Sequence, residues 1–117
     1  LADSYNKDYN ENSVVMRLSY KDQDFLFTGD LGQEGEEKLL ASGFNLESEY
    51  LKVGHHGSRY SSSEAFLQAV QPKICVISSG IDNTHGHPHK EAVERLKDAG
   101  CQIKDTQDLG LISFEID

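Results

Sequence analysis

Hydrophobic and polar residues alternate near the start of the chain in a way that predicts a β-hairpin. Apolar side chains occupy every second position from 14 to 20, which is typical of a strand with one buried face. Residues 21–23 are polar and suit a turn, and the apolar residues 25–27 suit a second strand. This strand ends at a Thr-Gly-Asp tripeptide whose last residue is Asp30.

The remaining periodicities predict three helices. Residues 32–42 suit a helix with its leucines on the buried edge and its charged residues, among them Glu36, in solvent. A second helix is expected to begin with a capping box formed by Ser61 and Glu64 and to end at Pro72. Pro88 suits the first position of a third helix.

Apolar runs between and after these helices predict four further strands, at about residues 50–53, 74–77, 101–103 and 111–114. The expected order is therefore β-β-α-β-α-β-α-β-β, which indicates an α/β (α+β) layered fold. Residues 1–12 are polar without periodicity and are interpreted as an N-terminal arm, and residues 13–117 as one structural unit.

Composition narrows the classes of function that are expected for this segment. Its 117 residues suit one modest domain, and the formal net charge is −9, from 20 acidic and 11 basic residues. No block of Lys and Arg marks a basic nucleic-acid surface, and no apolar run approaches the ~20 residues of a membrane-spanning helix. Cys75 and Cys101 are interpreted as buried free thiols, although a disulfide between neighbouring strands is possible in an oxidising compartment.

The candidate chemistry lies in three loops that each follow a predicted strand, at residues 28–30, 54–58 and 78–87. All five histidines occur between positions 55 and 89, and Asp30 ends the remaining loop. In open α/β sheets, ligands bind outside the carboxyl ends of the strands, so these side chains are expected at one rim. The alternative for the histidine pair alone is an ordinary solvated loop.

Asp30, His55 and His56 are the candidate metal ligands, because carboxylate and imidazole suit Zn²⁺, Mn²⁺ or Fe. His87 precedes a predicted helix N-terminus, which suits contact with a phosphate-like group and a hydrogen-bonding or acid role. Helix capping or simple surface exposure remains an equal alternative for His87. His85 is more easily explained as a loop residue, and His89 as a solvated helix residue.

Several segments in order resemble the metallo-β-lactamase superfamily, and more narrowly the C-terminal half of the hydrolase domain of ComEC-like DNA-internalisation competence proteins. These segments are the Thr-Gly-Asp turn at 28–30, the sequence LKVGHHGS at 51–58, the serines at 61–63, and GHPH at 86–89. The resemblance runs from about Asn10 to the end. It implies part of an αββα sandwich with a two-metal site, containing zinc or manganese, at its rim.

The resemblance also implies roles for individual residues. Asp30 corresponds to the carboxylate that bridges the metals, and His56 or His55 to a ligand of the second metal, with His56 favoured. His87 corresponds to a catalytic histidine near the substrate, and Ser58 is a further candidate for substrate binding. The implied activity is metal-dependent hydrolysis of a phosphodiester, with DNA as the candidate substrate, linked to DNA uptake.

The first ligand motif of the superfamily, HxHxDH, does not occur in this sequence. We therefore expect the chain to be the second half of a longer domain, to lack the N-terminal half as its partner, and to be inactive alone with one bound metal or none. Two alternatives stay open: a small-substrate hydrolase similar to phosphorylcholine esterases or lactonases, and a non-catalytic docking domain. A ComEC-like parent implies an extracytoplasmic domain of a bacterial membrane protein, while a cytoplasmic or secreted location suits the alternatives.

Overall fold

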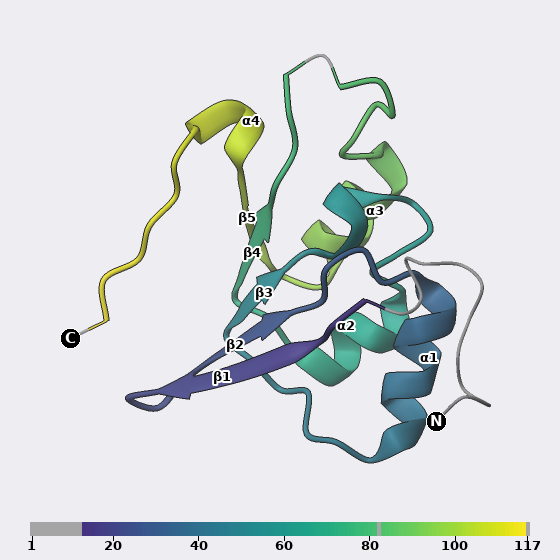
Figure 1. The fold of residues 1–117 in the computed structure, drawn as a ribbon, viewed down its shortest axis with the longest axis vertical. Helices are drawn as coiled ribbons and strands as arrows, with labels where there is room; N and C mark the ends of the chain where they lie inside the picture. Colours follow the sequence, from purple (N-terminus) through teal and green to yellow (C-terminus); the bar gives the residue numbers. More distant parts are fainter. Residues whose placement is uncertain (1–12, 82, 117) are drawn as a thin grey trace.

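The computed structural model describes residues 13–81 and 83–116, which form one sheet with helices packed against it (Figure 1). The sheet has five strands in the order β1-β2-β3-β4-β5. The strands are β1 (Met16–Tyr20), β2 (Gln23–Phe27), β3 (Tyr50–Lys52), β4 (Ile74–Ile77) and β5 (Gln102–Asp105). The helices are α1 (Gln33–Ser42), α2 (Glu64–Val70), α3 (Lys90–Asp98) and the short α4 (Thr106–Leu109), and a 3₁₀ turn, η3, spans Gly54–Gly57.

The first two strands form the expected antiparallel hairpin, and β2 to β5 run parallel. The register aligns Leu26 with Leu51, Leu51 with Cys75, and Cys75 with Ile103 across the four parallel strands. Because side chains alternate between the two faces of a sheet, this row faces one side together. The first three of these residues are at most 1% exposed and belong to the main hydrophobic core.

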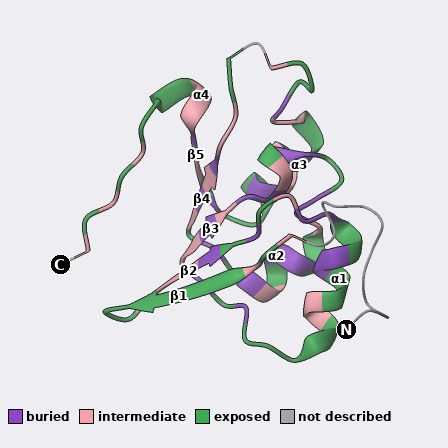
Figure 2. Cartoon of the chain, viewed as in Figure 1, coloured by how far each residue is buried: buried purple, intermediate pink, exposed green. Residues whose placement is uncertain are grey.

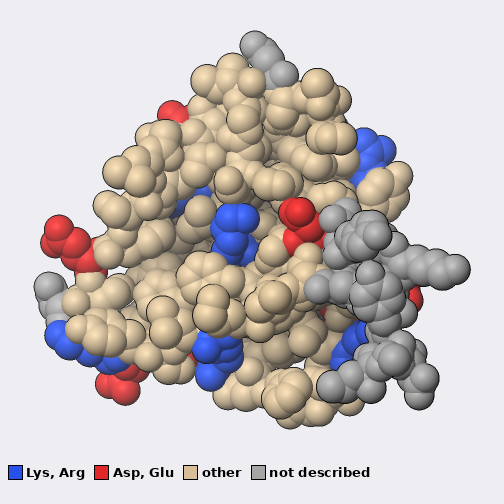
Figure 3. All heavy atoms as spheres, in the orientation of Figure 1, with Lys and Arg blue, Asp and Glu red and all other residues tan. Residues whose placement is uncertain are grey.

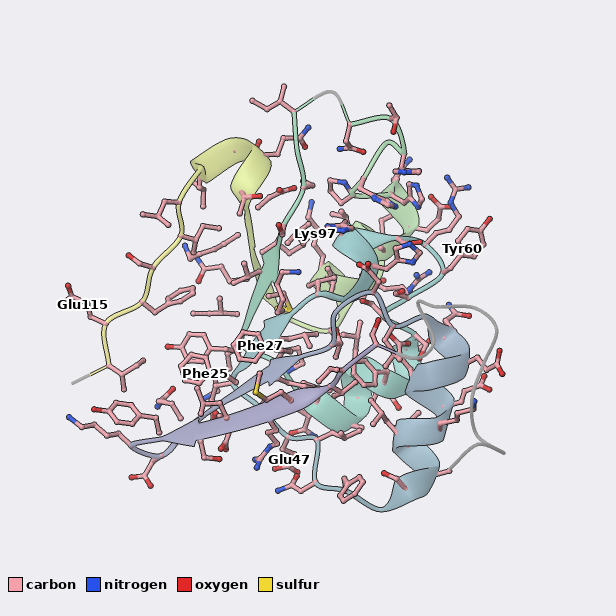
Figure 4. All side chains as sticks on the ribbon, in the orientation of Figure 1. Phe25, Phe27, Glu47, Tyr60, Lys97 and Glu115 are labelled. Atoms are coloured by element: carbon pink, nitrogen blue, oxygen red, sulfur yellow. A yellow bond between two sulfur atoms is a disulfide. The ribbon has the colours of Figure 1, made fainter. Side chains whose placement is uncertain are left out.

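The core lies between the sheet and helices α1, α2 and α3. Figure 1 shows these three helices together on one side of the sheet, while the segment after β5 runs down the other side. On that other side, Phe25 and Phe27 project from β2 (Figure 4) and line a groove with Tyr50 and Phe114. The helix-covered face is therefore tightly packed, and the opposite face carries only a partial cover.

The prediction that residues 14–20 form a strand with one buried face is wrong in its burial. All five residues of β1 are exposed, as Figure 2 shows, and Met16, Leu18 and Tyr20 are each more than half exposed. The strand lies at the edge of the sheet, where β2 is its neighbour. The apolar side chains of β1 therefore form a surface that no other described element covers.

Glu36 is buried on α1, whereas the sequence predicted a solvent-facing residue. It is 2% exposed, and its two carboxylate oxygens accept hydrogen bonds from the backbone N–H groups of Ser62 and Ser63, at 2.5 and 2.9 Å. Burial raises the pKa of Glu36 from its ordinary value of 4.5 to about 7, while these hydrogen bonds and Arg95 oppose the change. The carboxylate thus connects α1 to the serine-rich loop before α2.

That loop also corrects the predicted capping of α2. The N-cap is Ser63, whose hydroxyl accepts a hydrogen bond from the backbone N–H of Phe66. Ser61 instead donates its hydroxyl hydrogen to the carbonyl oxygen of Leu31, at 2.6 Å. On the opposite side, the guanidinium of Arg95 donates hydrogen bonds to three carbonyl oxygens of the loop, those of Arg59, Ser61 and Ser62. Residues 59–63 are therefore fixed between α1 and α3.

The end of the chain differs from the prediction of a strand at residues 111–114. The structure has α4 directly after β5 and no strand among residues 110–116. Phe114 packs edge-on against Tyr50, with ring centroids 5.0 Å apart. The segment after α4 therefore lies against the open face of the sheet through side-chain contacts and not by strand pairing.

Cys75 and Cys101 form a disulfide, which corrects the prediction of free thiols. Cys75 lies on β4, and Cys101 directly precedes β5, the neighbouring strand. The bond therefore joins the two strands beside the core.

The mixed α/β fold class is confirmed. The expected arm at residues 1–12 lies outside the described residues.

Charged side chains of both signs are interspersed on the face shown in Figure 3. No described helix has both the length and the apolar character needed to cross a bilayer.

Candidate metal centre

The carboxyl ends of β2, β3 and β4 bring the three predicted loops together at one edge of the sheet. The strands are adjacent and parallel, so their following loops emerge side by side. The backbone N–H of His55 donates to the carbonyl oxygen of Gly29, at 2.9 Å, which joins the first loop to the second. The ring of His56 bonds the carbonyl oxygen of Ser78, at 2.7 Å, which joins the second to the third.

Both histidines of η3 have left-handed backbone conformations, with φ of 52° at His55 and 55° at His56. Such φ values cost free energy in residues with a Cβ atom, and they concentrate at functional sites. The turn is held by a hydrogen bond from the Ser58 N–H to the His55 carbonyl oxygen, at 2.9 Å. Gly54 permits the close approach to the first loop, since a Cβ atom there would lie 3.0 Å from Oγ1 of Thr28.

Asp30 and His56 face each other across this edge. Oδ1 of Asp30 lies 3.4 Å from Nε2 of His56, and both side chains are about half exposed, at 45% and 47%. Because Nδ1 of His56 contacts a carbonyl oxygen, which can only accept, this nitrogen carries the proton in the neutral ring. In this tautomer Nε2, the nitrogen nearer Asp30, keeps its lone pair, as a metal-ligating histidine requires.

The donor atoms of Asp30 and His56 fit part of a metal site. Ligand atoms ~2.0–2.2 Å from Zn²⁺ at the tetrahedral angle lie ~3.4 Å apart, which agrees with the separation of this pair. Within residues 13–81 and 83–116, no cluster of three or more His, Cys, Asp or Glu side chains has an arrangement that could hold a metal ion. The described residues therefore supply a pair of candidate ligands rather than a complete set.

His87 lies at the centre of the histidine cluster. It is 9% exposed, and its ring centroid lies 4.7 to 5.8 Å from those of His55, His56, His85 and His89. Burial, and then the neighbouring imidazoles, lower the pKa of His87 below its ordinary value, which favours the neutral ring.

The predicted relation of His87 to a helix start needs correction. α3 begins at Lys90 with His89 as its N-cap, so Pro88 is not its first residue and His87 lies further from the helix dipole. The cis peptide bond between His87 and Pro88 lies in this approach to the helix. Contact between His87 and a substrate remains a prediction.

His89 connects two loops rather than lying on a solvated helix turn. Its Nδ1 accepts a hydrogen bond from the backbone N–H of Arg59, at 2.9 Å, and its Nε2 lies 3.0 Å from the carbonyl oxygen of His85. Only an Nε2–H tautomer satisfies both contacts. His85 itself is exposed, and its ring stacks at 5.6 Å from that of His87.

Ser58 is buried next to the histidine turn, at 1% exposure. Its hydroxyl oxygen accepts a hydrogen bond from the backbone N–H of Tyr60, at 3.1 Å. This contact gives Ser58 a role in shaping the turn, and substrate binding by Ser58 remains a prediction.

Two residues near the cluster were missed by the sequence analysis. Lys52, at the end of β3, is partly buried, and burial lowers its pKa while the carboxylate of Asp30 opposes the change. Its position between the buried Leu51 and Val53 was the available signal, because alternation directs it to the opposite face. Asn83 bonds the backbone of His87, and nothing in its local sequence predicted that contact.

Comparisons with known proteins identify the family of the chain. The family model of the metallo-beta-lactamase superfamily matches residues 5–81. The chain is 35% identical to ComE operon protein 3 of Bacillus subtilis (strain 168) over 105 residues, which are 90% of this chain and 14% of that protein. It is 41% identical to Competence protein ComA of Neisseria gonorrhoeae over 110 residues, 93% of this chain and 16% of that protein.

Recombination protein 2 of Haemophilus influenzae (strain ATCC 51907 / DSM 11121 / KW20 / Rd) is 33% identical over 97 residues, 83% of this chain and 12% of that protein. The chain thus spans about one-seventh of the length of these curated relatives. The similarities support a competence-related, hydrolase-like domain, and the superfamily typically binds divalent metal ions. The predicted resemblance is confirmed, and the chain belongs to the metallo-beta-lactamase superfamily.

Proposed function

We propose that this chain forms part of a metal-dependent phosphodiesterase domain that acts on DNA during uptake. The observation that carries the proposal is the pairing of Asp30 Oδ1 with Nε2 of His56, 3.4 Å apart, beside the buried His87. The similarity to proteins named for competence directs the choice of DNA as the substrate.

In this proposal Asp30 and His56 hold divalent cations, zinc or manganese, of which the complete domain contains two. When bound, such cations polarise a phosphoryl oxygen and increase the acidity of water. Asp30 would hold the cations through its carboxylate, and His56 would contribute a ring nitrogen whose orientation is fixed by the Ser78 carbonyl. His55 is the adjacent alternative ligand, and its ring faces that of His87 at 5.6 Å.

His87 acts on the substrate in this scheme. Its lowered pKa favours a neutral ring, which offers one N–H group to an oxygen of the phosphodiester. A hydrogen bond from this N–H steadies the leaving-group oxygen while the ester bond breaks. Four neighbouring imidazoles limit the orientations of the ring, so its donor is directed before the substrate binds.

The incomplete ligand pair and the open sheet face both fit a role for a further part of the domain. Phe25, Phe27 and Tyr50 line the groove on the face opposite the three helices, and β1 is exposed along its whole length. We propose that an N-terminal half packs against this face and supplies the remaining ligands. Association of that kind would bury the apolar edge of the hairpin.

The test is divalent-metal-dependent cleavage of single- and double-stranded DNA by the parent domain, compared with its Asp30→Asn and His56→Ala variants. We expect both substitutions to lower turnover at least ~100-fold and to lower the bound-metal content. Asp98→Asn, in the last turn of α3 and far from the three loops, is the matched control and is expected to change neither quantity. Full activity with unchanged metal content in both site variants would show that the assignment is wrong.

A further inference from the structure

We propose that the side chain of Asn83 positions the backbone of His87 where the phosphodiester would bind. The inference rests on the proposed function for its catalytic consequence. The contact between Asn83 and His87 can be tested in this chain without measuring activity.

The Asn83 amide bonds both polar backbone groups of His87. Oδ1 accepts a hydrogen bond from the His87 N–H, at 2.7 Å, and Nδ2 donates to the His87 carbonyl oxygen, also at 2.7 Å. Nδ2 also donates to the carbonyl oxygen of Gly80, at 2.8 Å. One amide therefore pairs with His87 as a neighbouring strand would, and it ties that residue to the start of the loop.

This pairing matters because residues 83–89 have no regular secondary structure. The loop contains Gly86, which has a φ of +68° and whose N–H donates to the carbonyl oxygen of Asn83, at 3.2 Å, so the turn before His87 also depends on Asn83. Beyond His87, the N–H of His89 donates to the carbonyl oxygen of Gly57, at 2.9 Å. His87 is thus fixed on one side by Asn83 and on the other by the histidine turn.

The amide chemistry of Asn83 is specific to this arrangement. Aspartate retains an acceptor for the His87 N–H, but it places a carboxylate oxygen against the carbonyl oxygens of Gly80 and His87, where a donor is needed. Alanine removes all three bonds. A neutral amide of this length is therefore the group that satisfies both the donor and the acceptors at once.

The first test is hydrogen exchange at the His87 backbone N–H in the 117-residue chain, measured by NMR. Asn83→Ala is expected to accelerate exchange on the order of ten-fold at His87. The matched control is Asn45→Ala, which removes one side-chain hydrogen bond to Glu47 in an exposed loop and is expected to leave His87 unchanged. Unchanged exchange at His87 in Asn83→Ala would overturn the proposal.

Asn83→Asp provides a second variant if the alanine variant does not fold. It is expected to shift the resonances of residues 80–87 while those of the core, such as Leu51, stay in place. Identical resonances for residues 80–87 in this variant would also overturn the inference.

The catalytic part is tested in the parent domain by a double-mutant cycle. Asn83→Ala is expected to lower kcat about 100-fold with KM and metal content unchanged, because a misplacement near 1 Å has that effect. In a His87→Ala background the same substitution is expected to have no further effect. An equal loss in both backgrounds would show that Asn83 acts on stability rather than through His87.

Failure of this proposal and failure of the proposed function give different results. A parent domain without phosphodiesterase activity contradicts the function, while slow, Asn83-dependent exchange at His87 would still establish the positioning contact. An active domain whose kcat is unaffected by Asn83→Ala contradicts the positioning role alone.

Discussion

Nε2 of His56 lies 3.4 Å from Oδ1 of Asp30, although the two residues follow different strands of the sheet. The backbone brings them together because β2 and β3 are parallel neighbours whose ends share one edge. The Ser78 carbonyl, from the end of β4, then fixes the tautomer of His56. Three strand ends thus build one oriented pair of candidate metal-ligating atoms.

Gly57 should tolerate no side chain, because two separate obstacles coincide there. Its φ is +80°, and an added Cβ atom would lie 2.7 Å from Cβ of Pro88. Gly43 is the matched control, with a φ of +81° and nothing within 4 Å of its built Cβ position. We expect Gly43→Ala to cost ~1 kcal/mol of unfolding free energy from the backbone alone, and Gly57→Ala to cost several-fold more.

Denaturant unfolding of both glycine variants checks this prediction. Equal losses would mean that backbone conformation accounts for the whole effect and that the contact with Pro88 is easily relieved. A larger loss in Gly57→Ala would show that the histidine turn and the approach to α3 are packed against each other.

Glu36 should make the stability of the chain depend on pH. Its pKa is raised by burial from 4.5 to about 7, so the folded state binds the proton more tightly than the unfolded state. The stabilisation is fully present below pH ~4.5 and is lost as the pH rises through ~7, a change on the order of 3 kcal/mol. Relative to Glu36→Gln, which does not titrate, the natural chain should lose stability across this range.

The measurement is the unfolding free energy of the natural chain and Glu36→Gln between pH 4.5 and 8. Glu37→Gln is the control, because Glu37 is the exposed neighbour on the same helix. A difference between the natural chain and Glu36→Gln that stays constant with pH, or that grows in the opposite direction, would contradict the prediction.

The disulfide between Cys75 and Cys101 should stabilise the chain by about 3 kcal/mol, because it closes a loop with a sequence separation of 26. Addition of a thiol reductant is expected to lower the denaturation midpoint of the natural chain. The double variant Cys75→Ala with Cys101→Ala serves as the control, since its midpoint should not respond to reductant. Two reactive thiols in the untreated, purified chain would refute this expectation.

Local patterns predicted the sheet and the rim well. The apolar residues at 25–27 and 74–77 lie in β2 and β4, the strands on either side of β3 in the sheet. Asp30 and the histidines that follow these three strands meet at one edge because parallel strands end together. These features depend on short-range periodicity and on a general rule of α/β sheets. The strands and their shared edge could therefore be predicted from the sequence without knowledge of any long-range contact.

The predictions that failed depend on partners distant in the sequence. Glu36 is buried because two N–H groups of the loop before α2 need an acceptor, which no helical pattern reveals. Asn83 was missed for a different reason: its partner His87 is only four residues away, but the loop that joins them has no periodicity from which the contact could be predicted. Residues 111–114 have an apolar composition, but they contact the sheet through side chains such as Phe114 rather than by strand pairing.

The most direct test of the central claim is a zinc titration of the 117-residue chain, followed by long-range ¹H–¹⁵N NMR of the histidine rings. Before zinc is added, His56 should carry its proton on Nδ1, as its bond to the Ser78 carbonyl requires. Zinc should then shift the Nε2 resonance of His56, and Asp30→Asn should weaken binding at least ~10-fold. Protonation of His56 on Nε2, or a zinc-induced shift at His55 with none at His56, would contradict the account.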